Sequence, residues 1–192
     1  MKTKDEWRRM IRIQRAGLTL EQINEWSKAA IRHLREWATF QQAQRIACYM
    51  AKPFEVQTQS FIEQCLTKGK QVCVPRHIDG KSGYEWSWVE PAGAWRDGPF
   101  RIAEPAHYNP VKIKEIELAI VPVVAVDTAG HRLGAGGGNF DRLLARMECP
   151  RAGLAFAFQV VEAIPMEAHD VPVNAIITQT GLHACEAAAE SI

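Results

Sequence analysis

The chain opens with two stretches whose apolar positions recur at the spacing of an α-helix. In residues 4–15, apolar side chains (Trp7, Met10, Ile11 and Ile13) alternate with basic ones, which predicts a helix with a strongly basic side. A second helix is predicted after Thr19, because Thr19 to Gln22 fits a capping box. The apolar face of this second helix would consist of Ile23, Trp26, Ala30, Leu34 and Trp37.

After these helices the chain alternates between short apolar runs and amphipathic segments. The runs predict strands at residues 45–50, 71–75, 118–126, 152–158 and 175–178. Helices are predicted over residues 58–68, where Gly69 ends the helix, and over residues 139–147. Residues 84–89 suggest a short hairpin within a Gly- and Trp-rich loop. The strand, helix and strand within residues 45–75 form a βαβ unit, which is typical of parallel sheets.

This pattern predicts an α/β fold with three layers, α/β/α, in which a mostly parallel central sheet follows the N-terminal helices. A chain of 192 residues with 47% hydrophobic content is long enough to build one core. We therefore expect residues 1–192 to form a single domain, with a loose tail over residues 182–192.

Charge and cysteine content exclude several classes of function. The net charge of +1 gives no reason to expect a nucleic-acid or membrane partner. The N-terminus is polar, and no apolar run approaches the roughly 18 residues of a membrane span, so we expect a cytoplasmic protein. The five cysteines are scattered without a Cys-x-x-Cys pair, which predicts free thiols rather than disulfides or a zinc site.

A cluster of glycines follows the most apolar run of the chain. Four glycines occupy the five positions from Gly134 to Gly138, and Arg132, Asp141 and Arg142 bracket them. Such a loop at the start of a helix can cradle phosphate oxygens with its backbone N–H groups. A Gly-rich turn is more often a simple chain reversal, and this one matches neither a Walker A loop nor the G-x-G-x-x-G pattern. The glycines alone therefore leave both interpretations open.

The segment around these glycines resembles a known family signature. The run Val126-Asp127-x-x-Gly130-x-Arg132-Leu133-Gly134-x-Gly136-Gly137-Gly138-x-Phe140-Asp141-Arg142 is similar to that of the 5-formyltetrahydrofolate cyclo-ligases. Further pieces agree in order and spacing, so the resemblance covers nearly the whole chain: Lys4-x-x-x-Arg8, residues 55–58, 69–75, 102–105, 153–156, 165–170 and 176–178.

The resemblance implies an ATP- and Mg²⁺-dependent enzyme. In its reaction, phosphorylation of the formyl oxygen of 5-formyltetrahydrofolate allows cyclisation to 5,10-methenyltetrahydrofolate, with release of ADP and phosphate. The implied partners are therefore two small molecules, a folate and ATP. We expect a monomer, and a weak homo-oligomer remains an alternative.

The resemblance also assigns candidate residues to each role. The catalytic pair would be Arg132 and Asp141. The ATP site would contain Lys4, Arg8, Arg132, Leu133, Gly134, Ala135, Gly136, Gly137, Gly138, Asn139 and Phe140. The folate site would contain Met50, Glu55, Phe100, Ala135 and Asn139, with Trp95 as a weaker candidate. The metal ligands would be Asp141 and Asn174. All these positions are read from the sequence.

Several of these residues also have a plain structural interpretation. Asp141 could cap the helix that it begins, and Lys4 and Arg8 could lie on a solvated helix face. Phe100 could belong to the core, and we expect His169 and Asp170 to be structural.

The chain departs from the family pattern at five positions. Ala135 replaces an aromatic or basic residue, Asn139-Phe140 replaces a Tyr-Tyr pair, Asn174 replaces an aspartate, and Gln179 replaces a glutamate. These changes remove hydroxyls and a charge that would serve folate and Mg²⁺. Two alternatives to the cyclo-ligase are therefore kept: a paralogue that acts on another formamide-bearing ligand, and a non-catalytic folate- or nucleotide-binding protein.

Overall fold

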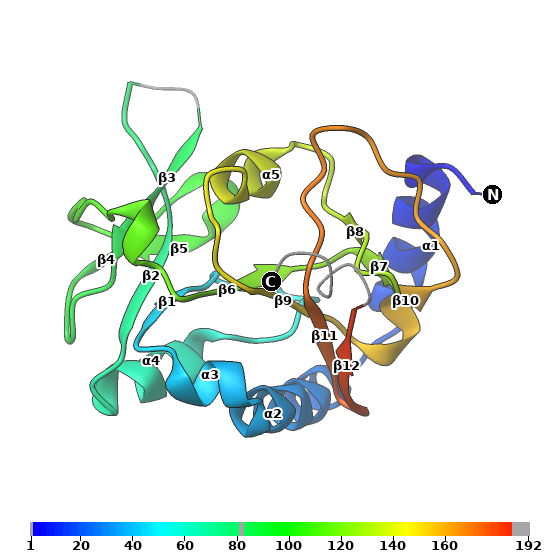
Figure 1. The fold of residues 1–192 in the computed structure, drawn as a ribbon, viewed down its shortest axis with the longest axis horizontal. Helices are drawn as coiled ribbons and strands as arrows, with labels where there is room; N and C mark the ends of the chain where they lie inside the picture. The colour runs from blue at the N-terminus through cyan, green and yellow to red at the C-terminus, as the bar shows by residue number, and fades with distance from the viewer. Residues whose placement is uncertain (1, 81–82, 186–192) are drawn as a thin grey trace.

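The protein is built around a seven-stranded sheet with the strand order β12-β11-β9-β6-β1-β2-β3 (Figure 1). The computed structural model describes residues 2–80 and 83–185. The inner strands pair in parallel, and the edge strands β3 and β12 are antiparallel to their neighbours. The strands are β1 (Arg45–Ala47), β2 (Gln71–His77), β3 (Tyr84–Trp88), β6 (Leu118–Pro122), β9 (Arg151–Leu154), β11 (Ala175–Thr178) and β12 (Gly181–Ala184).

Helices cover both faces of this sheet. The helices α2 (Leu20–Glu36), α3 (Ala38–Gln42) and α4 (Gln59–Thr67) lie along one face, and α5 (Asn139–Leu144) lies on the other (Figure 1). The helix α1 (Lys4–Ala16) stands apart and packs on a small sheet of β7 (Ala125–Asp127), β8 (Arg132–Leu133) and β10 (Val160–Val161). The predicted α/β class, the mostly parallel sheet and the N-terminal helices are therefore confirmed.

Both N-terminal helices begin as the sequence predicts. Thr19 accepts a hydrogen bond from the backbone of Gln22, and the Gln22 side chain accepts one from the backbone of Thr19, which completes a capping box. Thr3 and Glu6 form a second capping box at the start of α1. Each box satisfies backbone N–H groups that a helix start leaves unpaired, so the bounds of α1 and α2 are set locally.

The predicted strand over residues 118–126 is wrong in one respect, because the run is divided between two sheets. The strand β6 ends at Pro122, and β7 begins at Ala125 in the small sheet. Between them, the carbonyl of Val123 accepts hydrogen bonds from Arg15 Nη2 (2.6 Å) and Gln159 Nε2 (2.7 Å) rather than from a neighbouring strand. The glycine loop therefore follows the β7–β8 hairpin and not a strand of the main sheet.

Other elements also end earlier than predicted. The strands β1 and β9 and the helix α5 stop at Ala47, Leu154 and Leu144. The predicted hairpin at residues 84–89 is the single strand β3, which pairs with β2. The sequence also did not reveal α3, β4 (Trp95–Asp97), β5 (Ala103–Pro105) and the short strands β8 and β10.

The predicted loose tail is wrong for its first residues. The strand β12 pairs with β11 from Gly181 to Ala184, and Cys185 is buried. Residues 186–192 lie outside the described part of the chain. The five cysteines are free thiols, as predicted, and burial raises the pKa of Cys65 to about 11. No helix within residues 2–80 and 83–185 combines the length and apolar character that crossing a bilayer requires.

The turn of the β7–β8 hairpin provides a test of this packing. Gly130 has φ +93°, and a Cβ there would lie 2.3 Å from the carbonyl oxygen of Val173. We expect Gly130→Ala to lower the free energy of unfolding by about 3 kcal/mol, from backbone strain and overpacking together. Gly69→Ala is the matched control, because Gly69 has φ +78° with no atom within 4 Å of the added Cβ. It should cost only about 1 kcal/mol. Urea denaturation measures both free energies of unfolding, and an equal decrease for Gly130→Ala and Gly69→Ala would contradict the contribution from overpacking.

Candidate functional site

A cleft opens at the carboxyl ends of the parallel strands β1 and β6, where open α/β sheets bind ligands. Met50 and Glu55 line it from the segment after β1, and Pro122 lines it from the end of β6. Its remaining wall includes the glycine loop, residues 134–138. We call this space, which encloses a cavity of about 140 Å³, the apolar cleft.

A second, more polar cavity of about 580 Å³ lies beside the apolar cleft. Its wall carries Lys4 and Arg8 from α1, and Glu167 and Asp170 from the segment before β11. We call it the polar cavity. Gly134, Gly138 and Asp141 line both spaces, so they form a common wall. A ligand in the apolar cleft can therefore meet a ligand in the polar cavity at this wall.

The glycine loop leaves several backbone donors free. Gly136 and Gly138 have φ values of +105° and +62°, a conformation that glycine adopts without strain. Within the described ranges, the N–H groups of Ala135, Gly136 and Gly137 donate no hydrogen bond to the protein. The helix α5 has only six residues, so the cationic side chains around the loop contribute more positive potential than its short dipole does.

Arg132 and Asp141 form an ion pair at the base of the loop. Arg132 Nη2 lies 2.5 Å from Asp141 Oδ1, and the Arg132 side chain is only 1% exposed. Arg132 Nε is buried and has no hydrogen-bond partner. Asp141 Oδ1 also accepts a hydrogen bond from Val171 N at 3.3 Å. The Asp141 carboxylate thus forms its hydrogen bonds with residues outside α5. The N-cap of α5 has no side-chain hydrogen bond, so Asp141 does not cap this helix.

The basic face of α1 reaches this loop. Arg8 Nε donates a hydrogen bond to Gly134 O at 3.1 Å. Lys4 Nζ lies 2.5 Å from Asp170 Oδ2 and 3.1 Å from Glu167 Oε1. The side chains of Lys4 and Arg8 are only 15% and 23% exposed, which is not a solvated helix face. The resemblance and the structure therefore agree that these two residues belong at the loop.

The contact between Lys4 and Asp170 shifts both ionisation equilibria. Partial burial disfavours each charge, but the hydrogen bond and the attraction between the two outweigh it, so the pKa of Lys4 is raised and that of Asp170 is lowered. The pair stabilises the fold between the ordinary pKa values of the two groups, 3.8 and 10.5. This contribution is lost as the pH falls through the lowered value or rises through the raised one. Asp170 thus holds the Lys4 ammonium and also lines the polar cavity.

All five residues predicted for folate line the apolar cleft, namely Met50, Glu55, Phe100, Ala135 and Asn139. Glu55 Oε2 accepts a hydrogen bond from the backbone N–H of Lys52 at 2.9 Å, which fixes the carboxylate. Phe100 is 78% exposed at the opening, with φ +61°, and Lys52 Nζ lies 5.3 Å from its ring centroid. Phe100 is therefore not a core residue.

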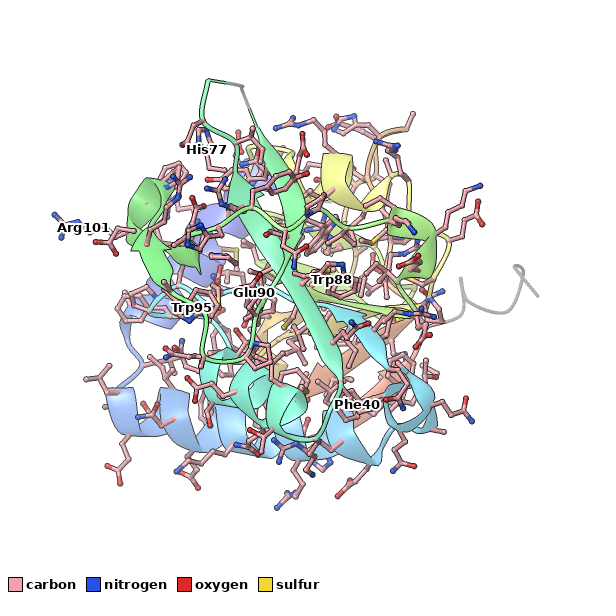
Figure 2. All side chains as sticks on the ribbon, turned by 90° about the vertical axis from the view of Figure 1, so that its left-hand side faces the viewer. Phe40, His77, Trp88, Glu90, Trp95 and Arg101 are labelled. Carbon is pink, nitrogen blue, oxygen red and sulfur yellow. The ribbon has the colours of Figure 1, made fainter. Side chains whose placement is uncertain are left out.

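Some predicted positions lie elsewhere or act differently. Asn174 precedes β11 and accepts a hydrogen bond from Arg151 N at 2.8 Å, at the amino ends of the strands and outside both cavities. Trp95 lies in β4 (Figure 2) and does not line the apolar cleft, although it lines a smaller cavity that Met50 also borders. Leu133 borders only the polar cavity and is buried. Arg142 Nη2 donates to Asn139 Oδ1 and Gly137 O, and so braces the loop.

The lining residues that the sequence analysis did not assign to the site include Lys52, Tyr84 and Glu104. Lys52 lies three residues before Glu55, so its closeness in sequence to a predicted folate residue could have identified it as a lining residue. Tyr84 and Glu104 come from β3 and β5, and no local pattern connects these strands with the glycine loop. Within residues 2–80 and 83–185, no group of three His, Cys, Asp or Glu residues could hold a metal ion by itself.

Comparison with known proteins agrees with this geometry. Residues 1–179 match the family model of the 5-formyltetrahydrofolate cyclo-ligase family. The chain is 30% identical over 175 residues to the 5-formyltetrahydrofolate cyclo-ligase of Escherichia coli (strain K12), covering 88% of this chain and 96% of the relative. It is 31% identical over 180 residues to the enzyme of the same name from Haemophilus influenzae, covering 91% and 96%.

Solved structures give the same answer. The NMR structure of the Aquifex aeolicus 5,10-methenyltetrahydrofolate synthetase superimposes with a TM-score of 0.84 at 30% identity, covering 95% of this chain and 93% of that one. The synthetase of Mycoplasma pneumoniae shares the fold, with a TM-score of 0.74 at 20% identity. The superposition covers 93% of this chain and 99% of that one. The sequence signature, the fold and these matches lead to one conclusion: the chain belongs to the 5-formyltetrahydrofolate cyclo-ligase family of enzymes.

Proposed function

We propose that this protein cyclises 5-formyltetrahydrofolate to 5,10-methenyltetrahydrofolate at the expense of ATP. The observation that carries the proposal is the wall of Gly134, Gly138 and Asp141, which the apolar cleft and the polar cavity have in common. A reaction that transfers a phosphoryl group from ATP to the formyl oxygen of a folate needs two such compartments in contact.

The polar cavity suits the triphosphate of ATP. Its cations come from Lys4 and Arg8, and the loop supplies the free N–H group of Gly136, which lines this cavity. Lys4 already contacts two carboxylates, but an ammonium has three donors, so one remains for a phosphate oxygen. Charge-assisted hydrogen bonds of this kind bind phosphate more strongly than neutral ones. The two acidic neighbours of Lys4 also hold its ammonium at the cavity wall before ATP arrives.

Asp141 fits a role in holding Mg²⁺. One of its oxygens bonds Arg132 and Val171, and the other has no hydrogen bond within the described residues. Magnesium on a nucleotide commonly needs only one or two carboxylates, because phosphates and water complete its shell. When bound, Mg²⁺ would neutralise charge on the phosphate oxygens. Asn174 lies too far from this wall in the fold to share that role as the structure stands.

The chemistry follows from the poor leaving group of the formyl amide. The formyl oxygen attacks the γ-phosphorus of ATP, and the bond from that phosphorus to the β,γ-bridging oxygen breaks to release ADP. N10 then bonds to the activated formyl carbon and loses its proton, and the carbon–oxygen bond breaks to release phosphate. Arg132, buried beside the loop with an unpaired Nε–H, is a fixed donor toward negative charge at this wall.

The proposal is tested directly by a turnover assay. Purified protein with 5-formyltetrahydrofolate, ATP and Mg²⁺ should form methenyltetrahydrofolate, measured by its absorbance, and omission of ATP should abolish the product. Folate binding without product would identify a non-catalytic binder. ATP hydrolysis stimulated only by a different formamide would identify an altered-substrate enzyme and contradict the proposal.

The role of Asp141 is tested by Asp141→Asn. Asparagine keeps an acceptor for Arg132 but loses the charge that Mg²⁺ requires, so we expect kcat to fall by about two orders of magnitude, as for loss of a preorganised electrostatic contact. A thermal melt should show a folded protein. Asp97→Asn is the control, because Asp97 is an exposed carboxylate that lines neither cavity. A kcat near that of the parent would remove Asp141 from the metal site.

The role of Lys4 is tested by Lys4→Ala. Removal of a phosphate-binding cation should raise the KM for ATP by about tenfold, since charge-assisted hydrogen bonds contribute roughly 1.5–3 kcal/mol. The KM for folate should change little, because Lys4 lines only the polar cavity. Lys112→Ala, at a lysine whose side chain is 85% exposed, is the matched control. Equal effects on both KM values would indicate a structural role for Lys4.

A further inference from the structure

Tyr84 lies where the apolar cleft continues into a second hollow. This hollow, which we call the outer groove, has a volume of about 390 Å³ and lies between the β2–β3 end of the sheet and the segment that holds Phe100. Tyr84, Pro99, Phe100 and Asn139 line both the cleft and the groove. A ligand longer than the cleft therefore leaves it past Tyr84.

The Tyr84 hydroxyl is free to bind a ligand. The chain has three tyrosines, and the other two are engaged: Tyr49 Oη donates to Val56 O at 2.9 Å, and Tyr108 Oη donates to the Glu85 carboxylate. Tyr84 Oη has no hydrogen bond to any residue in the ranges 2–80 and 83–185. The Tyr84 side chain is partly exposed and lines both hollows, so a ligand acceptor placed there can pair with its hydroxyl.

The Tyr84 ring is held in place from two sides. It packs against the core beneath the sheet and meets the His77 ring edge-on, with 5.7 Å between ring centroids. Figure 2 shows His77 near the upper end of β2 and the Arg101 side chain projecting away from the protein. The hydroxyl position is thus set by the fold and needs little ordering when a ligand binds.

The surroundings of Tyr84 select the kind of acceptor. Glu104, which is 2% exposed, lines the same cleft and is held by Arg96 Nε and His77 N, each at 2.9 Å. Burial and the Glu104 charge together raise the pKa of Tyr84, so the phenol stays protonated and can donate. Arg96 balances part of the Glu104 charge, and the negative potential that remains favours a neutral acceptor over a carboxylate at this point. The ligand acceptor is therefore a neutral carbonyl oxygen.

We propose that Tyr84 determines specificity for the tail of the folate, by donating a hydrogen bond to the amide carbonyl that joins the p-aminobenzoyl ring to glutamate. This inference rests on the proposed function, with the pterin ring beside Glu55, because that carboxylate lines the cleft and can accept hydrogen bonds from the pterin N–H groups. The outer groove then receives the glutamate, and its described lining contains the Arg142 guanidinium and no carboxylate.

The test compares two ligands on two variants without ATP. Isothermal titration calorimetry would measure the affinity of the parent and of Tyr84→Phe for 5-formyltetrahydrofolate and for 5-formyl-6-methyltetrahydropterin, which lacks the aminobenzoyl-glutamate tail. We expect Tyr84→Phe to weaken folate binding about three- to tenfold, as for one lost hydrogen bond, and to leave pterin binding unchanged. In turnover, the KM for folate should rise by the same factor while the KM for ATP stays constant.

Tyr108→Phe is the matched control, because it removes a tyrosine hydroxyl that lines neither the cleft nor the groove. It should bind both ligands as the parent does. Unchanged folate affinity in Tyr84→Phe overturns the inference, and so does an equal loss for both ligands, which would place Tyr84 at the pterin. If the parent binds folate but does not turn it over, only the proposed function is overturned, because the binding comparison still tests the role of Tyr84. A parent that binds neither ligand overturns both.

Discussion

The buried ion pair between Arg132 and Asp141 fixes the geometry on which the rest of the site depends. It joins β8 to the start of α5 and so closes the glycine loop at both ends. A buried pair contributes little net stability, because desolvation of both charges offsets their attraction. Truncation of either side chain to alanine, however, would remove the contact and leave the loop ends untied, whereas asparagine at position 141 would keep an acceptor for Arg132. The pair therefore acts chiefly by specifying one conformation of the loop.

The helix α1 completes the site from outside the main sheet. Its position depends on contacts with segments far along the chain: Trp7 Nε1 donates to Ala163 O at 3.1 Å, Arg8 Nε to Gly134 O, and Arg15 Nη2 to Val123 O. These bonds tie the helix to the loop and to the break between β6 and β7. The polar cavity thus exists in this form only when α1 is docked against these segments.

The break in the apolar run at Val123 and Val124 has a functional consequence. Both residues line the apolar cleft, and their carbonyls are satisfied by the Gln159 side chain at 2.7 and 2.9 Å. A continuous strand would have kept this backbone in the sheet. The departure from the strand instead opens the floor of the cleft and turns the chain toward the hairpin that carries Arg132.

The sequence by itself determined the helices α1, α2, α4 and α5, the inner strands of the sheet and the glycine loop, because each depends mainly on near neighbours. Capping boxes at Thr3 and Thr19 and the apolar periodicity of α2 are satisfied within a few residues. The resemblance supplied the site residues at the loop, which the structure brings together around one wall.

Only the tertiary structure decided the rest. The position of Asn174 away from this wall, the division of the run at residues 118–126, and the convergence of Lys52, Tyr84 and Glu104 depend on how distant segments pack. A cavity is made by side chains from separate strands, and no local pattern of polar and apolar positions records which strands will be neighbours.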